Sequence, residues 1–135
     1  MLANGATLGY KTTGNTYTNL PGLKEIPDLG VEPEKVENTC LTDGHKMYEM
    51  GIGDLPEMTY KFKYDNSSAT SPYRVLRGLQ DAGTVADFEE TLKDGTKTHY
   101  SAQVSVKRTG GAVNGVIEFE ATMMVQSEFT ITDPA

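Results

Sequence analysis

The sequence predicts a mainly β protein, an antiparallel β-sandwich or partly closed barrel with one short flanking α-helix at about residues 71–82. Three observations predict this class: strict alternation of apolar and polar residues in several segments, a single segment with helical periodicity, and turn-forming residues between the alternating segments. Such alternation is typical of antiparallel sheets with one packed and one solvated face. A length of 135 residues fits one domain with a substantial core, so we expect residues 1–135 to form a single domain.

Three prolines, Pro21, Pro27 and Pro33, recur six residues apart in the segment 20–37, which otherwise reads as extended chain. In extended chain, amide groups an even number of residues apart point to the same side. The prolines would therefore remove three hydrogen-bond donors from one strand edge if no bulge intervenes. We expect a rim segment that stays out of regular ladders and leaves strand pairing to other edges.

Segment 42–57 combines glycines and a proline with an unusual number of apolar residues, namely Met47, Tyr48, Met50, Ile52 and Leu55. It shows too little alternation for a strand, so we expect a long loop. Two interpretations of its apolar side chains remain open. Either the loop folds back on the core of its own subunit, or a neighbouring molecule buries these side chains.

The clearest strand is MTYKFKYD, residues 58–65, in which the alternation has no exception. The face expected to pack carries Met58, Tyr60, Phe62 and Tyr64. The face expected to meet water carries Thr59, Lys61, Lys63 and Asp65.

The helical segment is SPYRVLRGLQDAG. We expect Ser71 to cap it, Pro72 to occupy its first turn, and Gly83 to end it in the left-handed conformation. Its apolar stripe, which should seal an open side of the sheet, consists of Val75, Leu76, Leu79 and Ala82.

The C-terminal half contains two more long strand patterns, THYSAQVSVKR and VIEFEATMMVQ, and two shorter candidates, VADFEETL and FTIT. An Asp-Gly pair at 94–95 predicts a tight hairpin turn, and the glycine-rich segment 109–116 a longer connection. Period two places Tyr100, Ala102, Val104, Val106, Ile117, Phe119, Ala121, Met123 and Val125 on packed faces. Glu118 and Glu120 fall on a wet face, where Lys61 and Lys63 could lie opposite them as cross-strand pairs. The candidate wet-face residues are Lys61, Lys63, Ser101, Gln103, Glu118 and Glu120.

Composition excludes several classes of protein. The chain has 12 basic and 19 acidic residues, a net charge of −7, which argues against a protein that grips phosphate backbones. A lone cysteine, Cys40, cannot form an internal disulfide, and the N-terminus has no apolar signal-peptide core, so we expect folding in a reducing cytoplasm. No apolar run is long enough to span a bilayer.

No catalytic, cofactor-binding or metal-binding residue is expected. The two histidines, His45 and His99, lack the spacing of a zinc site. Cys40, Asp43 and His45 lie too close in sequence to assemble a nucleophile, a base and an orienting group. Glycine-rich phosphate-binding motifs are absent from the sequence.

The order of motifs resembles the major tail tube proteins of long-tailed bacteriophages. LGYKTT is followed by LPGLKEIPDLGVEPEKVENTCLTDG, an apolar glycine-bearing loop, LPEMTYKFKYDN, a short helix and paired C-terminal strands. The resemblance spans nearly the whole chain and is closest to the short single-domain versions from phages and prophages of Gram-positive bacteria. Some relatives carry an additional C-terminal immunoglobulin-like domain, and we expect none in this chain.

The resemblance implies a structural virion protein without enzymatic activity, metal or cofactor. In this family, subunits form hexameric rings that stack into a tube through which DNA leaves the particle, and the long loop, here residues 42–57, reaches the next ring. The implied partners are further copies of the chain and the tape measure, tail terminator and baseplate proteins, with DNA passing transiently. Assembly would take place in the cytoplasm of the bacterial host, and the product would be part of the virion tail.

Three alternatives remain from the sequence. The inner tube of a contractile tail or secretion device shares the fold, and a neighbouring sheath gene would favour it. A monomeric β-sandwich binding module for sugar or protein would stay monomeric at every concentration. A small hydrolase using glutamates or the Cys40 and His45 neighbourhood would lose turnover on a single substitution.

Overall fold

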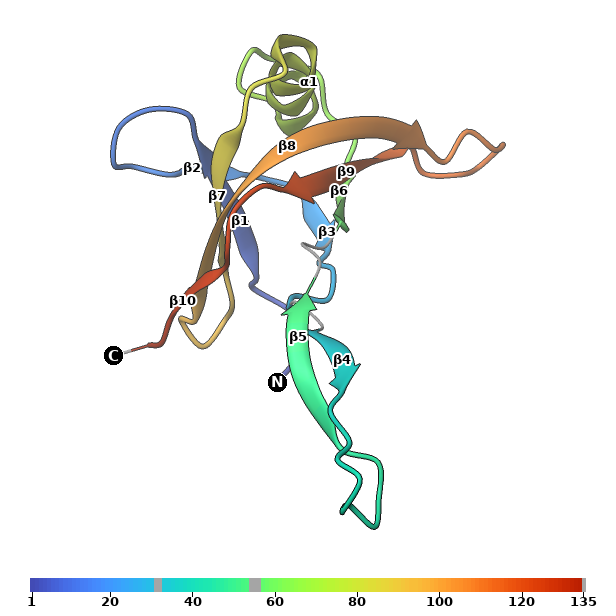
Figure 1. Ribbon diagram of the computed structural model, residues 1–135. Coiled ribbons are helices and arrows are strands. Elements are labelled where there is room, and N and C mark those ends of the chain that lie inside the picture. The colour runs from blue at the N-terminus through green and yellow to red at the C-terminus, as the bar shows by residue number, and fades with distance from the viewer. Residues whose placement is uncertain (31–32, 54–56, 135) are drawn as a thin grey trace.

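The computed structural model describes residues 1–30, 33–53 and 57–134 and consists mainly of β-strands (Figure 1). All strand pairs within these ranges are antiparallel. The elements are β1 (Thr7–Lys11), β2 (Thr18–Leu20), β3 (Leu23–Glu25), β4 (Pro33–Glu37), β5 (Tyr48–Gly53), β6 (Glu57–Lys63), α1 (Pro72–Ala82), β7 (Ala86–Thr91), β8 (Lys97–Thr109), β9 (Glu118–Val125) and β10 (Thr130–Thr132).

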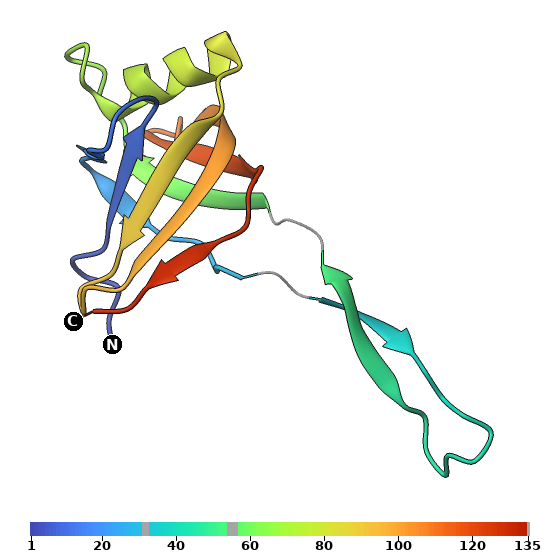
Figure 2. The same ribbon diagram turned by 60° about the vertical axis from the view of Figure 1, so that its left-hand side comes forward.

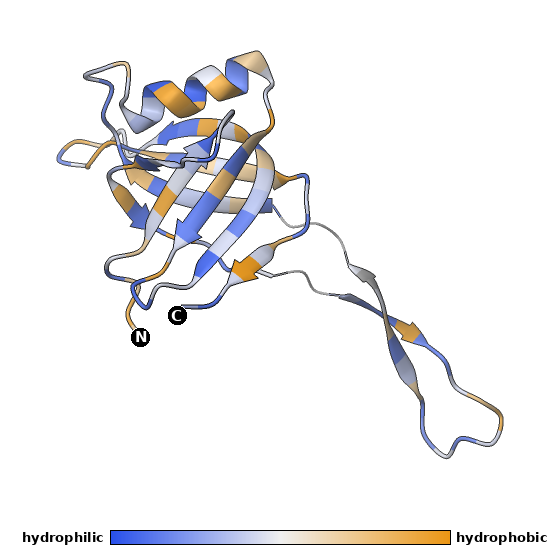
Figure 3. Cartoon of the chain, turned by 90° about the vertical axis from the view of Figure 1, so that its left-hand side faces the viewer, coloured by the Kyte–Doolittle hydropathy of each residue, from blue (hydrophilic) through white to orange (hydrophobic). Residues whose placement is uncertain are grey.

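The body of the protein is one eight-stranded sheet that curls on itself. Its strands follow the order β2-β1-β7-β8-β9-β6-β3, and β10 pairs with β8 off this path. Figures 2 and 3 show the sheet bent into a partly closed barrel, with α1 lying across one end. The structure thus confirms a mainly antiparallel β fold with one short helix, and the barrel is made from one continuous sheet.

The interior of the barrel is filled by the side chains that the alternation assigns to it. β6, β8 and β9 alternate between buried and more exposed residues, as period two requires. Aromatic rings stack between neighbouring strands inside the barrel, with Phe62 of β6 and its cross-strand partner Phe119 of β9 5.1 Å apart between ring centroids. The buried apolar residues are Leu8, Leu20, Met58, Tyr60, Phe62, Leu76, Ala86, Phe88, Tyr100, Ala102, Val104, Phe119, Ala121, Met123 and Val125.

Some strand ends differ from the sequence-based expectation. Tyr64 follows the last residue of β6 and is 37 % exposed, because the alternation holds only while the strand is paired. Its ring packs edge-on against Tyr73 of α1, with centroids 4.9 Å apart. Ile117 precedes β9 and is also exposed. Val106 is only partly buried.

Helix α1 begins and ends close to the predicted residues. Pro72 occupies its first turn, and Gly83 ends it at φ 65°, in the left-handed region. Ser71 takes the N-cap position without the expected side-chain hydrogen bond to the helix, because its Oγ accepts a hydrogen bond from the Ser68 N–H instead. Leu76 is buried, whereas Ala82 at the end of the helix is exposed, which corrects the predicted stripe.

The C-terminal part of α1 covers an edge of β8. β7 pairs with β8 only as far as the Ala86–Ala102 rung, so β8 has no strand on that side beyond this point within the described residues. There the Gln80 side-chain oxygen accepts a hydrogen bond from the Val106 N–H at 2.9 Å. The helix therefore satisfies a backbone donor of an edge that other chains would otherwise reach.

Segment 42–57, expected to be a loop, contains a strand. β5 pairs with β4 in a separate two-stranded sheet, and β6 begins at Glu57. The strand was not predicted because Gly51 and Gly53 occupy two of its six positions and leave too few side chains to show alternation. Leu55 lies outside the described residues.

Candidate assembly surfaces

Residues 33–53 form a hairpin that projects from the body, which we call the arm. Figures 2 and 3 show it leaving the end of the barrel opposite α1. Beyond the two strands, the Asn38 N–H donates to the Met47 carbonyl at 2.8 Å, and the Met47 N–H donates to Thr39 Oγ1 at 3.0 Å. Near the tip, the Cys40 N–H donates to Asp43 Oδ2 at 2.7 Å. The arm is therefore held by hydrogen bonds within itself.

The apolar side chains of the arm face solvent. Met47 is 51 % exposed, Tyr48 56 % and Met50 82 %. These residues therefore do not fold back on the core of their own subunit, which was one of the two interpretations of this segment. The side chain of Ile52 lies outside the described part of the structure. Exposed apolar side chains that lie together are typical of protein interaction sites.

The pairing of the arm's strands determines which side chains share a face. Lys35 lies across from Met50 and Glu37 across from Tyr48, so these four residues share one face. The opposite face carries Val36 and its cross-strand neighbour Glu49. One face of the arm therefore combines an aromatic ring and a thioether with one charge of each sign.

The outer face of β6, β9 and β8 is polar and organised in rungs. Lys61 lies across from Glu120, which lies across from Lys107 on the next strand. The neighbouring rung carries hydroxyl groups, with Thr59 Oγ1 3.2 Å from Thr122 Oγ1. We call this surface the polar face.

The predicted cross-strand pairs on the polar face are confirmed as neighbours, but the ion pairs run elsewhere. Lys63 is the cross-strand partner of Glu118, as Lys61 is of Glu120. The ion pairs instead connect Glu118 and Lys61 to β3, with Lys24 Nζ 3.1 Å from Glu118 Oε1 and Lys61 Nζ 3.5 Å from Glu25 Oε2. Acidic and basic side chains thus alternate across the surface, and neither sign dominates.

The other two candidates on this face are fixed by hydrogen bonds. Ser101 Oγ donates to Asp87 Oδ1 on β7. Gln103 Nε2 donates to the Gly83 carbonyl at 3.3 Å, which joins β8 to the end of α1. Both therefore have partners within the subunit.

The three evenly spaced prolines do not lie along one strand edge. Pro21 lies between β2 and β3, Pro27 follows β3, and Pro33 is the first residue of β4. Between the first two, β3 pairs with β6 as part of the barrel. The assumption of one continuous extended segment was therefore wrong, because the chain turns at Gly22, where φ is 84°.

A polar cluster inside the core was not predicted. Glu90 is only 1 % exposed, and its Oε2 accepts a hydrogen bond from the Tyr60 hydroxyl at 2.8 Å. The Tyr100 hydroxyl donates in turn to the Tyr60 oxygen at 2.9 Å. Burial raises the pKa of Glu90, and the hydrogen bond from Tyr60 opposes that rise. Glu90 is in phase with the buried Ala86 and Phe88, so its position in the alternation was the signal for its burial.

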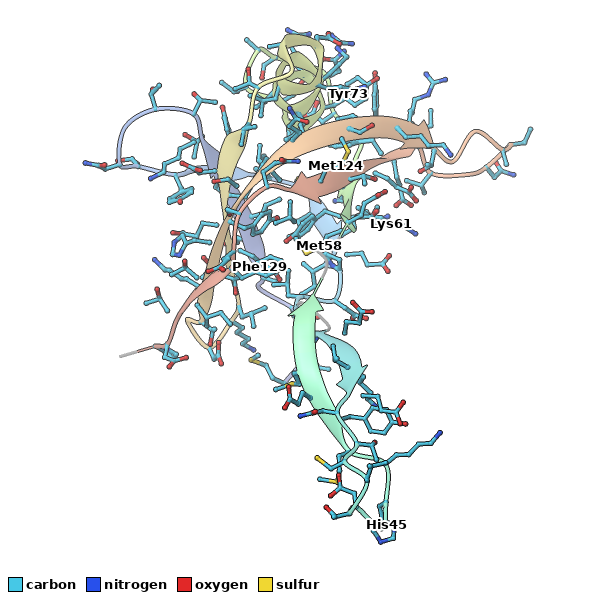
Figure 4. The ribbon with its side chains drawn as sticks, viewed as in Figure 1. His45, Met58, Lys61, Tyr73, Met124 and Phe129 are labelled. Carbon is cyan, nitrogen blue, oxygen red and sulfur yellow. The ribbon has the colours of Figure 1, made fainter. Side chains whose placement is uncertain are left out.

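The two histidines considered as metal ligands are not brought together. His45 lies at the tip of the arm (Figure 4), whereas His99 lies on β8, with its Nε2 2.8 Å from Glu89 Oε2. Among the described residues, no group of three or more His, Cys, Asp or Glu side chains is arranged to hold a metal ion. Over the same ranges, no helix combines the length and apolarity needed to cross a membrane.

The fold is that of tail tube-like proteins. It is similar to a chain in the virion of a native gene transfer agent particle, with a TM-score of 0.72, 14 % identity and 98 % of each chain covered. It is also similar to a chain in the C6-symmetric tail of an empty gene transfer agent particle, with a TM-score of 0.68, 17 % identity and coverage of 93 % of this chain and 95 % of that one. A chain in the six-fold symmetrised baseplate of an anti-feeding prophage gives a TM-score of 0.67 at 5 % identity, with 98 % and 95 % covered.

The sequence assigns the chain to a family. The model of the phage tail tube protein family, TTP, matches residues 3–134, so the chain belongs to this family. No curated protein matches the sequence. The chain is thus a structural component of a virion tail and not an enzyme.

Proposed function

We propose that the chain assembles into hexameric rings that stack into the tube of a phage tail and form the channel for DNA delivery. The observation that carries this proposal is the arm, whose apolar side chains are exposed in the single subunit. The six-fold symmetry of the gene transfer agent tail and of the anti-feeding prophage baseplate, whose chains share this fold, supports rings of six.

The arm is the contact to the next ring in this proposal. Residues 1–135 form one tail tube domain, and the segment 42–57 supplies an inter-subunit contact through Met47, Tyr48, Met50, Ile52 and Leu55. An isolated two-stranded hairpin is marginally stable in water, so a partner that covers it also orders it. The arm then becomes fixed only when another copy provides a surface.

The polar face lines the channel. Its cations are interspersed with acidic side chains, because Lys61 and Lys107 flank Glu120 across the strands and Lys24 is paired with Glu118. Binding of DNA draws on clustered cations that release condensed counterions, and such clusters are missing from this surface as the structure describes it. DNA therefore passes without being retained.

The prolines act as local restraints on pairing. Pro33 begins β4 and has no N–H to donate, which limits how another strand can extend this end of the arm. Pro21 and Pro27 also lack an N–H, and they limit strand pairing on either side of β3.

The wider assignment follows the motifs of the sequence. The motif order resembles that of the short tail tube proteins from phages and prophages of Gram-positive bacteria, which would assemble in the host cytoplasm. Tape measure, tail terminator and baseplate proteins would complete the tail. A sheath gene beside this one would instead favour the inner tube of a contractile tail or secretion device.

Electron microscopy of the purified chain tests the proposal. Negatively stained samples at increasing protein concentration are expected to show hollow rods of uniform width above a threshold concentration. A chain that sediments as a monomer at every concentration and gives no rods would contradict the proposal.

A further inference from the structure

Helix α1 has an outer face that is directed away from the core of the subunit. Arg74, Arg77, Gly78 and Asp81 follow the spacing of three and four residues that places side chains on one side of a helix. All four are exposed, whereas Leu76 on the opposite side is buried in the core. The outer face is therefore accessible to another molecule.

The two arginines of this face are positioned without being neutralised. Arg74 donates from Nε to the Asn66 side-chain oxygen and from Nη2 to the Asn66 carbonyl, both at 2.9 Å. The Arg77 guanidinium lies 5.3 Å from the ring centroid of Tyr73. Within the described part of the chain, neither arginine belongs to an ion pair. Both positive charges thus remain available to an acidic partner.

Gly78 has no explanation within the subunit. Glycine inside a helix is less favourable than alanine by about 1 kcal/mol. A Cβ atom built on Gly78 meets nothing within 4 Å. The absent side chain instead leaves room for a partner to approach the helix backbone closely.

The arm offers a surface of matching chemistry. Residues 33–53 contain four acidic and two basic residues, a net charge of −2. Glu37 lies across from Tyr48, and Met50 follows on the same face with Lys35 across from it. Guanidinium groups pair with carboxylates and stack on aromatic rings, so Glu37 and Tyr48 together suit an arginine.

The arm and the helix lie at opposite ends of the molecule (Figures 2 and 3). A contact between them therefore joins two copies of the chain and not two parts of one copy. Repetition of the same head-to-tail contact produces a stack, because each copy provides an arm and receives one.

We propose that the outer face of α1 is the surface that receives the arm of a second copy. Glu37 and Tyr48 of the arm meet Arg74 and Arg77, and Met50 lies over Gly78. This assignment rests on the proposed function, in which the arm contacts the next ring, and it names the receiving surface.

Substitution of Gly78 tests the proposal without a change of charge. Gly78→Leu is expected to fold with an unchanged or higher melting temperature, because leucine is a better helix former than glycine. It is expected to form no tubes at concentrations where the unmodified chain does. Gly111→Leu is the matched control, since a Cβ at Gly111 also meets nothing within 4 Å, and it is expected to form tubes.

A charge exchange tests the same contact independently. Arg74→Glu combined with Arg77→Glu is expected to raise the threshold concentration for tubes at least tenfold. Adding Glu37→Arg to this double variant is expected to lower the threshold again, because opposite charges then face each other. Circular dichroism of each variant verifies that the monomer is folded.

Each outcome bears on one of the two proposals. Normal tubes from Gly78→Leu, loss of tubes in the Gly111→Leu control as well, or no rescue by Glu37→Arg would overturn the assignment of α1 as the receiving surface. In all three cases tubes of the unmodified chain would leave the proposed function standing. Absence of tubes from the unmodified chain would contradict the proposed function, and the docking assignment would fail with it.

Discussion

At the scale of single residues, Glu90 is a carboxyl group surrounded by the apolar core. It accepts a hydrogen bond from the Tyr60 hydroxyl, whose oxygen accepts one from the Tyr100 hydroxyl. Burial disfavours its ionised form, and the low polarity of the surroundings makes the loss of a partner costly. This cluster therefore makes the stability of the subunit depend on pH and on both tyrosine hydroxyls.

Stability is expected to fall as pH rises above the unfolded pKa of Glu90. The pKa of this carboxyl is raised in the folded state, so its contribution to the free energy of unfolding is fully present below the unfolded value of about 4.5 and is lost as pH rises through the folded pKa. Urea unfolding of the monomer between pH 4 and 8 measures this loss. Glu90→Gln is expected to reduce the dependence, whereas exposed Glu128→Gln serves as the control. An identical pH profile for Glu90→Gln would contradict the assignment.

The two tyrosine hydroxyls are expected to differ in their contributions. Tyr60→Phe removes the donor to Glu90 and the acceptor of Tyr100, so it should lower the free energy of unfolding by about 1–3 kcal/mol. Tyr100→Phe removes only one donor and leaves the bond from Tyr60 to Glu90 intact, so its effect should be smaller. Equilibrium unfolding in denaturant gives the order, and the reverse order would contradict this description of the chain.

At the scale of elements, alternation predicted the strands whose side chains enter the core and failed where side chains are missing or strands end. β6, β8 and β9 follow period two along most of their length. β5 was missed because its two glycines interrupt the pattern, and Tyr64 was misplaced because the sheet ends before it. The apolar residues of segment 42–57 identified a candidate contact surface. The pairing that places Tyr48 beside Glu37 depends on the register between β4 and β5, which could not be predicted from the sequence pattern.

Lys61, Glu120 and Lys107 form a charged rung across β6, β9 and β8. We expect it to favour the pairing of these strands and to limit the positive charge of the polar face. Glu120→Lys would place a lysine between Lys61 and Lys107, so that one rung carries three lysines. Like charges on neighbouring strands should lower the free energy of unfolding by roughly 0.2–1 kcal/mol. Assembled tubes of this variant should also retain DNA at low salt and release it as salt is raised. Gel-shift titration at several salt concentrations measures retention, with Glu120→Gln as the control; equal retention by both variants would argue against this face as the channel lining.

The arm is expected to serve assembly and not folding. Replacement of four arm residues by serine, namely Met47, Tyr48, Met50 and Ile52, should leave the monomer folded. The side chains of Met47, Tyr48 and Met50 are exposed and do not belong to the core. Exposed substitutions typically change stability by about 0.5 kcal/mol or less each. Tubes should nevertheless be lost in electron micrographs. Normal tubes from this variant would reject the role of the arm.

At the scale of the whole molecule, the subunit consists of a barrel with a packed core and an arm whose apolar side chains are exposed. The barrel has a continuous core, with one end covered by α1. Within the described residues, the strands of the arm pair only with each other, and Met47, Tyr48 and Met50 are exposed. In the proposed assembly, stability and polymerisation thus depend on different parts of the chain. A template that covers the arm can then drive polymerisation without refolding of the barrel.

Hydrogen exchange of the arm, compared between monomers and tubes, tests this central claim most directly. In monomers, amides of residues 33–53 should exchange far faster than those of β8 and β9, because a solitary two-stranded hairpin opens readily. In tubes, the same arm amides should become strongly protected, while the barrel amides change little. Arm amides that are already protected in the monomer, or that stay unprotected in the tube, would contradict the account.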